Sequence, residues 1–174
     1  MPVFRHKLVP SVSFSYSPDY GHERWGYWSS YERPASDGTM QTVYYDRYAS
    51  GVYGGSPTRG RAASISFSVA NNLEMKYWGK NDTTDTGKKI TIIDNFSFGT
   101  SYNFVADSLN WSNVNASLRW KFLDKFSLNL DMIFDPYTYQ LNSFGNPVKV
   151  NVSQFEKNKV LFRLMSTGTS FGYT

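Results

Sequence analysis

The stretch VNASLRWKFLDKFSLNLDMIF, at residues 114–134, decides the fold class of this chain. Residues 114–122 and 126–134 each have an apolar side chain at every second position, and the side chains between them are polar apart from Ile133. A period of two places successive side chains on opposite faces of a β-sheet. Two such runs, separated by three residues, predict an antiparallel hairpin with one apolar face and one polar face.

The register of this hairpin follows from keeping Phe122 and Phe126 on the same face, with a three-residue loop at 123–125. The pairs that this register predicts are Trp120 with Leu128 and Leu118 with Leu130 on the apolar face, and Ser117 with Asp131 on the polar face. Arg119 then lies one diagonal step from Asp131, within reach for side chains of this length. We therefore expect a contact between Arg119 and Asp131.

The same alternation extends outward over most of the chain. It predicts strands at about residues 9–16, 63–78, 89–105, 111–122, 126–136 and 160–173, with long loops at 17–62 and 137–159. Several of these strands reach or exceed the roughly 9–11 residues that a tilted membrane-spanning strand needs. Six strands cannot close a membrane barrel, for which about eight is the minimum. The predicted fold class is therefore all-β, and residues 1–174 are expected to form part of one large transmembrane β-barrel domain, as an antiparallel up-and-down meander of about six long strands.

Composition favours the same class. The chain has 13 Phe, 13 Tyr and 5 Trp, and the aromatic residues gather near the predicted strand ends. Aromatic girdles flank the apolar band of membrane barrels, although aromatic residues are also common in any strand. Only 18% of residues are charged, and the net charge is +4. The absence of cysteine excludes disulfides, thiolate metal sites and cysteine nucleophiles.

The polar phase of the strands consists mostly of Ser, Asn and Thr, which suits the wet and crowded interior of a barrel. The charged side chains in this phase are expected to face the lumen: Glu74, Lys76, Arg119, Lys121 and Asp131. Six residues break the pattern: Asn71, Asp94 and Thr100 in the apolar phase, and Ala70, Ile93 and Ile133 in the polar phase. Asp94 interrupts the apolar phase near a predicted strand end, where a carboxylate at a membrane interface would cost less than at the midplane. Asn71 interrupts the apolar phase in mid-strand without an evident reason, and Ile93 interrupts the polar phase.

No catalytic, cofactor or metal site is predicted, so the chain is not expected to be an enzyme. His6 and His22 have no second imidazole at ligand spacing, and the acidic loop 81–85 lacks the glutamate pattern of a calcium loop. There is no phosphate-binding glycine loop, and the Gly-x-Ser-x-Gly match at residues 168–172 lies within a predicted strand rather than at the strand-to-helix turn of a nucleophile elbow. The positive charges lie mostly outside the aromatic phase, so nucleic acid is not an expected partner.

Several blocks of the sequence resemble LptD-like lipopolysaccharide-assembly proteins. These blocks are residues 6–21, 51–55 (GVYGG), 64–76 (SISFSVANNLEMK), 88–112 (KKITIIDNFSFGTSYNFVADSLNWS), 134–137 and 163–166. They are similar to the C-terminal barrel portion of the divergent, cysteine-free branch of that family. The resemblance implies a non-catalytic role in the outer membrane, in which lipopolysaccharide arrives from periplasmic bridge proteins and is placed in the outer leaflet.

The resemblance also implies the partners: lipopolysaccharide, a plug lipoprotein inside the barrel, the bridge proteins and outer-membrane lipids. Lys76, Arg119 and Lys121 are expected near the lumenal path or the plug. Residues 1–10 do not contain the apolar run of a signal peptide, so an export signal is expected upstream.

Two alternatives share these features of the sequence. One is another outer-membrane barrel, a porin or a receptor. The other is a soluble carbohydrate-binding β-sandwich, in which a second sheet of the same chain would cover Phe67, Phe98, Leu118 and Leu130. A membrane sheet would instead leave those four side chains open to lipid.

Overall fold

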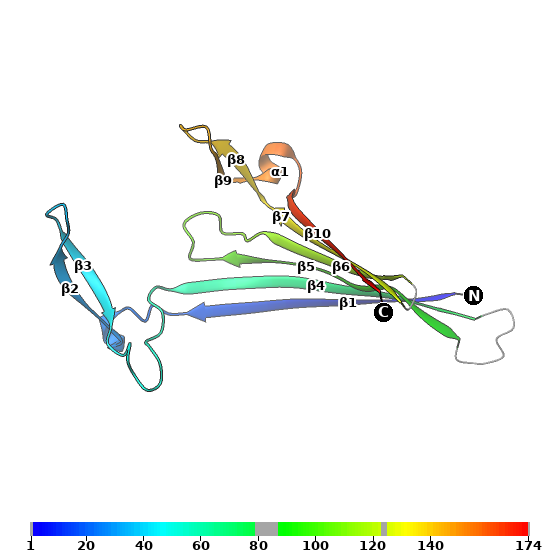
Figure 1. The fold of residues 1–174 in the computed structure, drawn as a ribbon, viewed down its shortest axis with the longest axis horizontal. Helices are drawn as coiled ribbons and strands as arrows, with labels where there is room; N and C mark the ends of the chain where they lie inside the picture. Colours follow the sequence, from blue (N-terminus) through cyan, green and yellow to red (C-terminus); the bar gives the residue numbers. More distant parts are fainter. Residues whose placement is uncertain (1, 79–86, 123–124, 174) are drawn as a thin grey trace. The chain divides into compact units, whose positions relative to one another are not determined.

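The computed structural model describes residues 2–78, 87–122 and 125–173. Its main feature is a six-stranded sheet in the order β1-β4-β5-β6-β7-β10 (Figure 1). These strands are β1 (Val3–Ser17), β4 (Ala62–Tyr77), β5 (Lys88–Asn103), β6 (Val114–Phe122), β7 (Phe126–Asp135) and β10 (Arg163–Tyr173). The pairings from β4 to β10 are antiparallel and join strands that are sequential neighbours, apart from inserted hairpins. The predicted all-β antiparallel meander is confirmed.

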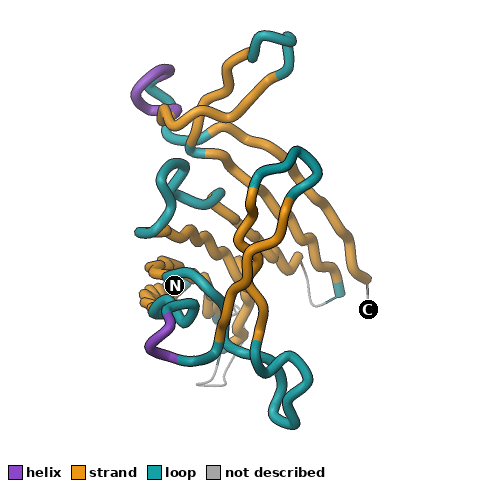
Figure 2. The backbone as a smooth tube through the Cα atoms, turned by 90° about the vertical axis from the view of Figure 1, so that its left-hand side faces the viewer, coloured by secondary structure: helices purple, strands orange, loops and turns teal. Residues whose placement is uncertain are grey.

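The two long connections contain hairpins that the sequence pattern did not predict. Residues 17–62 hold η1 (Glu23–Trp25), β2 (Trp28–Pro34) and β3 (Met40–Asp46), and residues 137–159 hold β8 (Tyr137–Leu141), β9 (Pro147–Ser153) and α1 (Gln154–Asn158). Each hairpin turns at a glycine in the left-handed region, Gly38 with φ 82° and Gly145 with φ 78°, a conformation that favours glycine. Strand dominates the described chain, and the helical segments are short (Figure 2).

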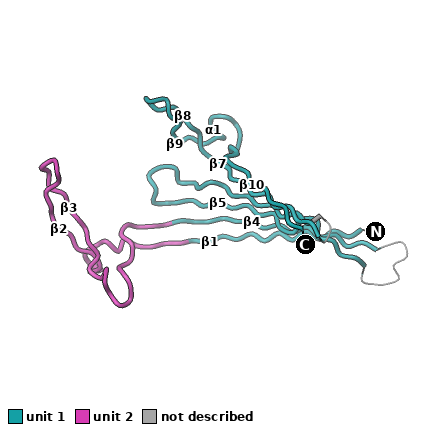
Figure 3. The backbone as a smooth tube through the Cα atoms, in the orientation of Figure 1, with its two compact units in different colours: residues 1–14, 64–174 teal, residues 15–63 magenta. Residues whose placement is uncertain are grey.

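The chain divides into two compact units (Figure 3). One unit is formed by Ser15–Ala63 and contains the β2–β3 hairpin. The other is formed by Met1–Phe14 together with Ser64–Thr174, and contains almost all of the six-stranded sheet and the β8–β9 hairpin.

The starts of three strands differ from their predicted positions by three or more residues, and one of them is β10, which begins at Arg163 rather than at 160. β1 begins at Val3 rather than near residue 9 and includes Pro10, which is tolerated because β1 is an edge strand of the sheet and its outer side has no ladder bonds to lose. β6 begins at Val114 rather than at 111, and Trp111 makes only an isolated bridge with Tyr102.

The β6–β7 register is as predicted. Trp120 pairs with Leu128, Leu118 with Leu130, and Ser117 with Asp131. The pairing of Phe122 with Phe126 closes the hairpin, and residues 123–124 of its loop lie outside the described residues. Since Phe98 pairs with Ala116, and Ala116 with Met132, the apolar phases of β5, β6 and β7 share one side of the sheet.

The side chains that mark this apolar face, Phe67, Phe98, Leu118 and Leu130, are not buried by the described residues. Phe67 is 38% exposed and Phe98 43% exposed, while Leu118 and Leu130 are half-buried. Among the described residues, the buried apolar side chains are Val114, Ala116 and Tyr137. Within the unit that contains the sheet, no described segment forms the covering sheet that a β-sandwich would require.

Candidate functional site

The candidate functional site is the polar face of the six-stranded sheet, opposite the apolar face. A row of paired residues crosses this face: Ala70, Ser97, Ser117, Asp131 and Gly168. Because side chains two residues apart on a strand point to the same side, the register places all five predicted charged residues here: Glu74, Lys76, Arg119, Lys121 and Asp131. That this face lines a lumen remains a prediction.

Two carboxylates on this face each lie between two cations. Glu74 is 2.8 Å from the Lys89 ammonium and 3.9 Å from the Arg5 guanidinium. Asp94 is 3.8 Å from Arg119 and 3.7 Å from Lys121. Of these pairs only Glu74–Lys89 is at hydrogen-bond distance, and exposed pairs stabilise a fold by about 1 kcal/mol or less. The two clusters therefore leave an excess of positive charge on the face.

The position of Asp94 follows from an irregular register between β4 and β5. The pairing is regular up to Asn71, then shifts by one residue between Asn71 and Leu73, and shifts again between Leu73 and Glu74. Each shift adds one residue to β5 relative to β4, in the manner of a β-bulge. Because the side-chain period is two, one shift exchanges the two faces and the second restores them.

Residues between the two shifts therefore face opposite to the expected sides. Ile93 lies opposite Leu73, in phase with the apolar face. The Asp94 carboxylate lies beside Arg119 and Lys121 on the polar face. The expectation that Asp94 belongs to the lipid phase at an interface is wrong, because it assumed an unbroken alternation.

Side-chain amides of β4 hold this irregular segment. The Asn72 Nδ2 group donates to the carbonyls of Ile93 and Asp94, at 3.3 and 2.8 Å. The Asn71 Nδ2 group donates to the Phe96 carbonyl at 3.2 Å, and Asn71 Oδ1 lies 3.2 Å from Nε2 of His6. Bulges leave backbone groups without ladder partners, so these amides supply hydrogen bonds that the ladder does not. This accounts for a polar residue in mid-strand on the apolar phase.

The expected contact between Arg119 and Asp131 is not formed. Arg119 Nε instead donates to Oδ1 of Asn129, its direct cross-strand partner, at 3.2 Å. Its guanidinium also faces Asp94 of the neighbouring β5. Arg119 therefore binds Asn129 and Asp94 instead of the diagonal residue Asp131. Asp131 has no ion pair with any described residue.

The centre of the polar face is a shallow hollow. Its polar lining consists of small side chains beside one carboxylate: Ser68, Ser97, Asn115, Ser117 and Asp131. Gly99 lies among them, and a Cβ atom there would be 3.1 Å from the Phe67 carbonyl and 3.3 Å from the Ser68 Cβ. The hollow is also lined by Phe98, Ala116, Met132 and Ile133, so apolar atoms make up a large part of its surface.

A buried ion pair lies at the end of β7. Asp135 is fully buried and accepts hydrogen bonds from the Lys149 ammonium at 2.7 Å, the Tyr139 hydroxyl at 2.9 Å and the Tyr137 amide at 2.9 Å. The Pro136 carbonyl accepts from the Gln154 amide at 2.7 Å. These contacts join the β8–β9 hairpin and α1 to the sheet. The sequence singled out residues 134–137 only through a family resemblance and gave Asp135 no role.

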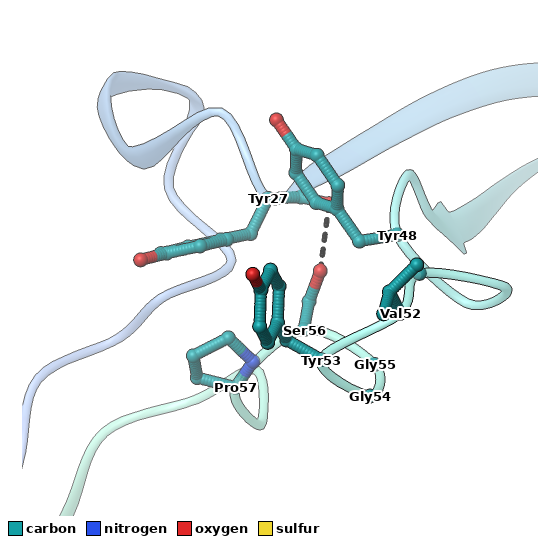
Figure 4. Close-up of a pocket in the computed structure, with 9 residues that line it drawn as sticks. Tyr27, Tyr48, Val52, Tyr53, Gly54, Gly55, Ser56 and Pro57 are labelled. Atoms are coloured by element: carbon teal, nitrogen blue, oxygen red, sulfur yellow. Dashed lines mark hydrogen bonds between the residues drawn. The ribbon is translucent and has the colours of Figure 1, made fainter.

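The unit formed by Ser15–Ala63 has a separate cleft lined by tyrosines (Figure 4). Tyr27, Tyr48 and Tyr53 border it, and the Ser56 hydroxyl oxygen lies 3.2 Å from the Tyr27 carbonyl oxygen. The Asp46 carboxylate accepts from the Ser56 hydroxyl and from the Ser56 amide, the latter at 2.7 Å. The hydrogen bond from the Ser56 hydroxyl is the main cause that lowers the pKa of Asp46 below its usual value.

The part of the chain that the structure describes contains no candidate metal site and no membrane-spanning helix. There, no three His, Cys, Asp or Glu side chains gather in a group that could hold a metal ion. None of the helices in the described ranges has the length and apolarity to cross a membrane.

Comparison with known proteins gives one family. The family model described as LptD protein matches residues 1–137, which include all of β1 to β7. No curated protein and no solved structure matches this chain.

Proposed function

The chain belongs to the LptD protein family, and from this membership we propose that it is part of the outer-membrane translocon that inserts lipopolysaccharide into the outer leaflet. A broad role in lipopolysaccharide transport and assembly follows from the family. The finer proposal adds the location, the barrel and the insertion step. It involves no catalysis by this chain, whose task is to provide a path between two environments.

The observation that carries the proposal is the uncovered apolar face of the sheet. Phe98 in β5, Phe126 in β7 and Phe171 in β10 are 43%, 50% and 78% exposed. A contiguous apolar surface of this kind is unusual in a soluble monomer, whereas lipid tails would cover it in a bilayer. β4 and β5 contain 16 residues each, more than the roughly 9–11 that a membrane-spanning strand needs.

The sheet edges fit the same proposal. β1 and β10 are the outer strands of the described sheet, so one side of each has backbone groups without ladder partners. In lipid, unpaired backbone groups cost several kcal/mol each. We propose that further strands of the whole protein pair with β1 and β10 and close the barrel.

The polar face would then line the lumen. Its Ser, Asn and Gly residues would leave space for water, and the cations of Arg119, Lys121 and Lys89 would attract the phosphates of a lipopolysaccharide headgroup. The proposed protein partners are a plug lipoprotein inside the barrel and periplasmic bridge proteins that deliver the lipid.

Site-specific photocrosslinking in cells that make the full-length protein would test this proposal. A photoreactive residue at position 119 or 121 should capture lipopolysaccharide or the plug protein, because these positions would face the lumen. The same photoreactive residue at position 98 or 130, on the apolar face of the neighbouring strands β5 and β7, is the matched control and should capture neither plug nor bridge protein.

The crosslinking pattern also separates the alternatives. Capture of neither lipopolysaccharide nor plug from positions 119 and 121 would contradict the translocon and favour a porin or receptor. Capture of the plug from Phe98 rather than from the polar positions would reverse the assignment of the two faces.

A further inference from the structure

We propose that the junction of β8, α1 and β10 is a binding site for the phosphate group of an anionic amphiphile. The site is a cleft of about 460 Å³, within the size range of small-ligand sites. Its lining combines two cations, polar side chains that include the amides of Gln154 and Asn158, and the aromatic or apolar side chains of Tyr139, Val160 and Phe162. The cations are Lys157 and Arg163. The lining residues come from β8, α1, the connection at 159–162 and the first residue of β10, and the three elements lie beside the end of β7 (Figure 1).

The two cations of the cleft have no carboxylate partner among the described residues. Arg163 lies opposite Asp135 in the sheet, but the Asp135 carboxylate is already held by Lys149 at 2.7 Å. Glu156 is the sole acidic residue of the sequence from 137 to 163, against four basic residues, and it makes no ion pair with a described residue. Lys157 and Arg163 are therefore available to a ligand anion.

The geometry of Arg163 favours a phosphate. Its guanidinium lies over the Tyr139 ring, 5.0 Å from the ring centre, and stacking of this kind leaves the planar N–H groups free to donate outward. The Tyr139 hydroxyl is itself fixed by donating to Asp135 at 2.9 Å. The arginine thus lies on a ring whose orientation is set by a buried carboxylate, so less side-chain freedom is lost when it binds.

The apolar part of the cleft favours an amphiphile over a free anion. Val160 is 54% exposed and Phe162 40% exposed, and both line the same cleft as the cations. Leu161 between them is 65% exposed. A ligand with a phosphate next to an acyl or alkyl group would pair its charge with Lys157 and Arg163 and cover these side chains.

Calorimetric titration of the full-length protein in a neutral detergent would test the site. The probes are dioctanoyl phosphatidic acid, dioctanoylglycerol as the same lipid without phosphate, and inorganic phosphate. We expect saturable binding of the phosphatidic acid, no binding of dioctanoylglycerol, and much weaker binding of inorganic phosphate. Equal affinity for inorganic phosphate and phosphatidic acid would overturn the assignment to an amphiphile.

Charge-removing variants distinguish binding at this cleft from general attraction of the anionic lipid to the positive charge of the segment. Lys157→Gln and Arg163→Gln should each weaken phosphatidic acid binding at least about tenfold, the effect of one lost charge-assisted hydrogen bond, and Arg163→Lys should restore part of it. Lys159→Gln is the matched control, because it removes a charge from the same segment outside the cleft lining. Equal weakening by Lys159→Gln, or no weakening by Lys157→Gln, would overturn the proposal.

This site does not depend on the proposed transport role. Lys157 is exposed and outside the buried Asp135 contacts, so its variant tests the site even if Arg163→Gln does not fold. Failure of the titration would leave the lumenal crosslinks at Arg119 unaffected, and failure of those crosslinks would leave the titration unaffected.

Discussion

Replacement of Lys149 by methionine should release the β8–β9 hairpin from the end of β7. Lys149 donates to the fully buried Asp135 at 2.7 Å, and its side chain is 26% exposed. The variant would leave Asp135 with the Tyr139 hydroxyl and the Tyr137 amide but without a compensating charge.

The magnitude follows from burial. Removing one partner of a buried ion pair costs about 3–5 kcal/mol, and the partial exposure of Lys149 together with the two remaining hydrogen bonds favours the low end, about 3 kcal/mol. At roughly 1.4 kcal/mol per tenfold change, local opening of the hairpin should become about 150-fold more frequent.

Hydrogen exchange of the β8 and β9 backbone amides, measured on the full-length protein, reads this opening directly. Amides of β5 and β6 should keep their wild-type exchange rates. The control variant Lys159→Met, which removes an exposed cation, should change the free energy of hairpin opening by less than about 0.5 kcal/mol. If β8 and β9 exchange in Lys149→Met as slowly as in the wild type, the buried pair is not what attaches the hairpin.

Three further changes test other parts of the structure. Asn72→Leu leaves the Asp94 carbonyl without its 2.8 Å hydrogen bond and should lower the unfolding free energy by about 1–3 kcal/mol; unchanged denaturant midpoints would contradict the role of the amide in the bulge. Ser56→Ala should raise the pKa of Asp46 toward its ordinary value, because the main hydrogen bond that lowers it is lost. Because the pKa of Asp46 is lower in the folded state than in the unfolded state, its carboxylate stabilises the fold at pH values above the unfolded-state pKa. This stabilisation is lost as the pH falls through the folded-state pKa. The wild-type Ser15–Ala63 unit should therefore resist proteolysis to a lower pH than the variant, and coincident pH profiles would refute this. Phe98→Arg, on the apolar face, should destabilise the membrane-inserted protein by about 2–4 kcal/mol if that face meets the bilayer midplane. The measurement is the amount of assembled protein in membranes, which should fall. Normal assembly would show that this face does not meet lipid.

The sequence was sufficient for the β6–β7 hairpin and for the face on which each candidate residue lies. Apolar residues at every second position and a connection of three residues allow few registers, and the register that keeps Phe122 and Phe126 on one face is the one found. All five predicted charged residues lie on the polar face for the same reason. Their ion-pair partners Arg5, Lys89 and Asp94 were not predicted, because pairing across strands depends on how β4 pairs with β1 and on the irregular register of β4 with β5.

The alternation of the sequence predicted the wrong side of the sheet for Ile93 and Asp94, where the register of β4 with β5 shifts. Asp94 and Ile93 looked like errors in a regular strand, yet each lies on the side that suits its chemistry once the two register shifts are known. The amide of Asn72 accompanies those shifts from 21 and 22 residues away. No local pattern shows which backbone carbonyls that amide will reach.

Alternation in the sequence by itself determined the all-β class, the two faces and the order of the long strands, because the period of two is a property of each strand alone. The tertiary structure decided the bulge, the two inserted hairpins and the contacts that join them to the sheet. Asp135, Lys149 and Arg163 have no spacing that relates them along the chain, and they meet only because β7, β9 and β10 converge at one end of the sheet. Buried charge needs a partner wherever the fold can supply one, and only the completed fold specifies which residue that is.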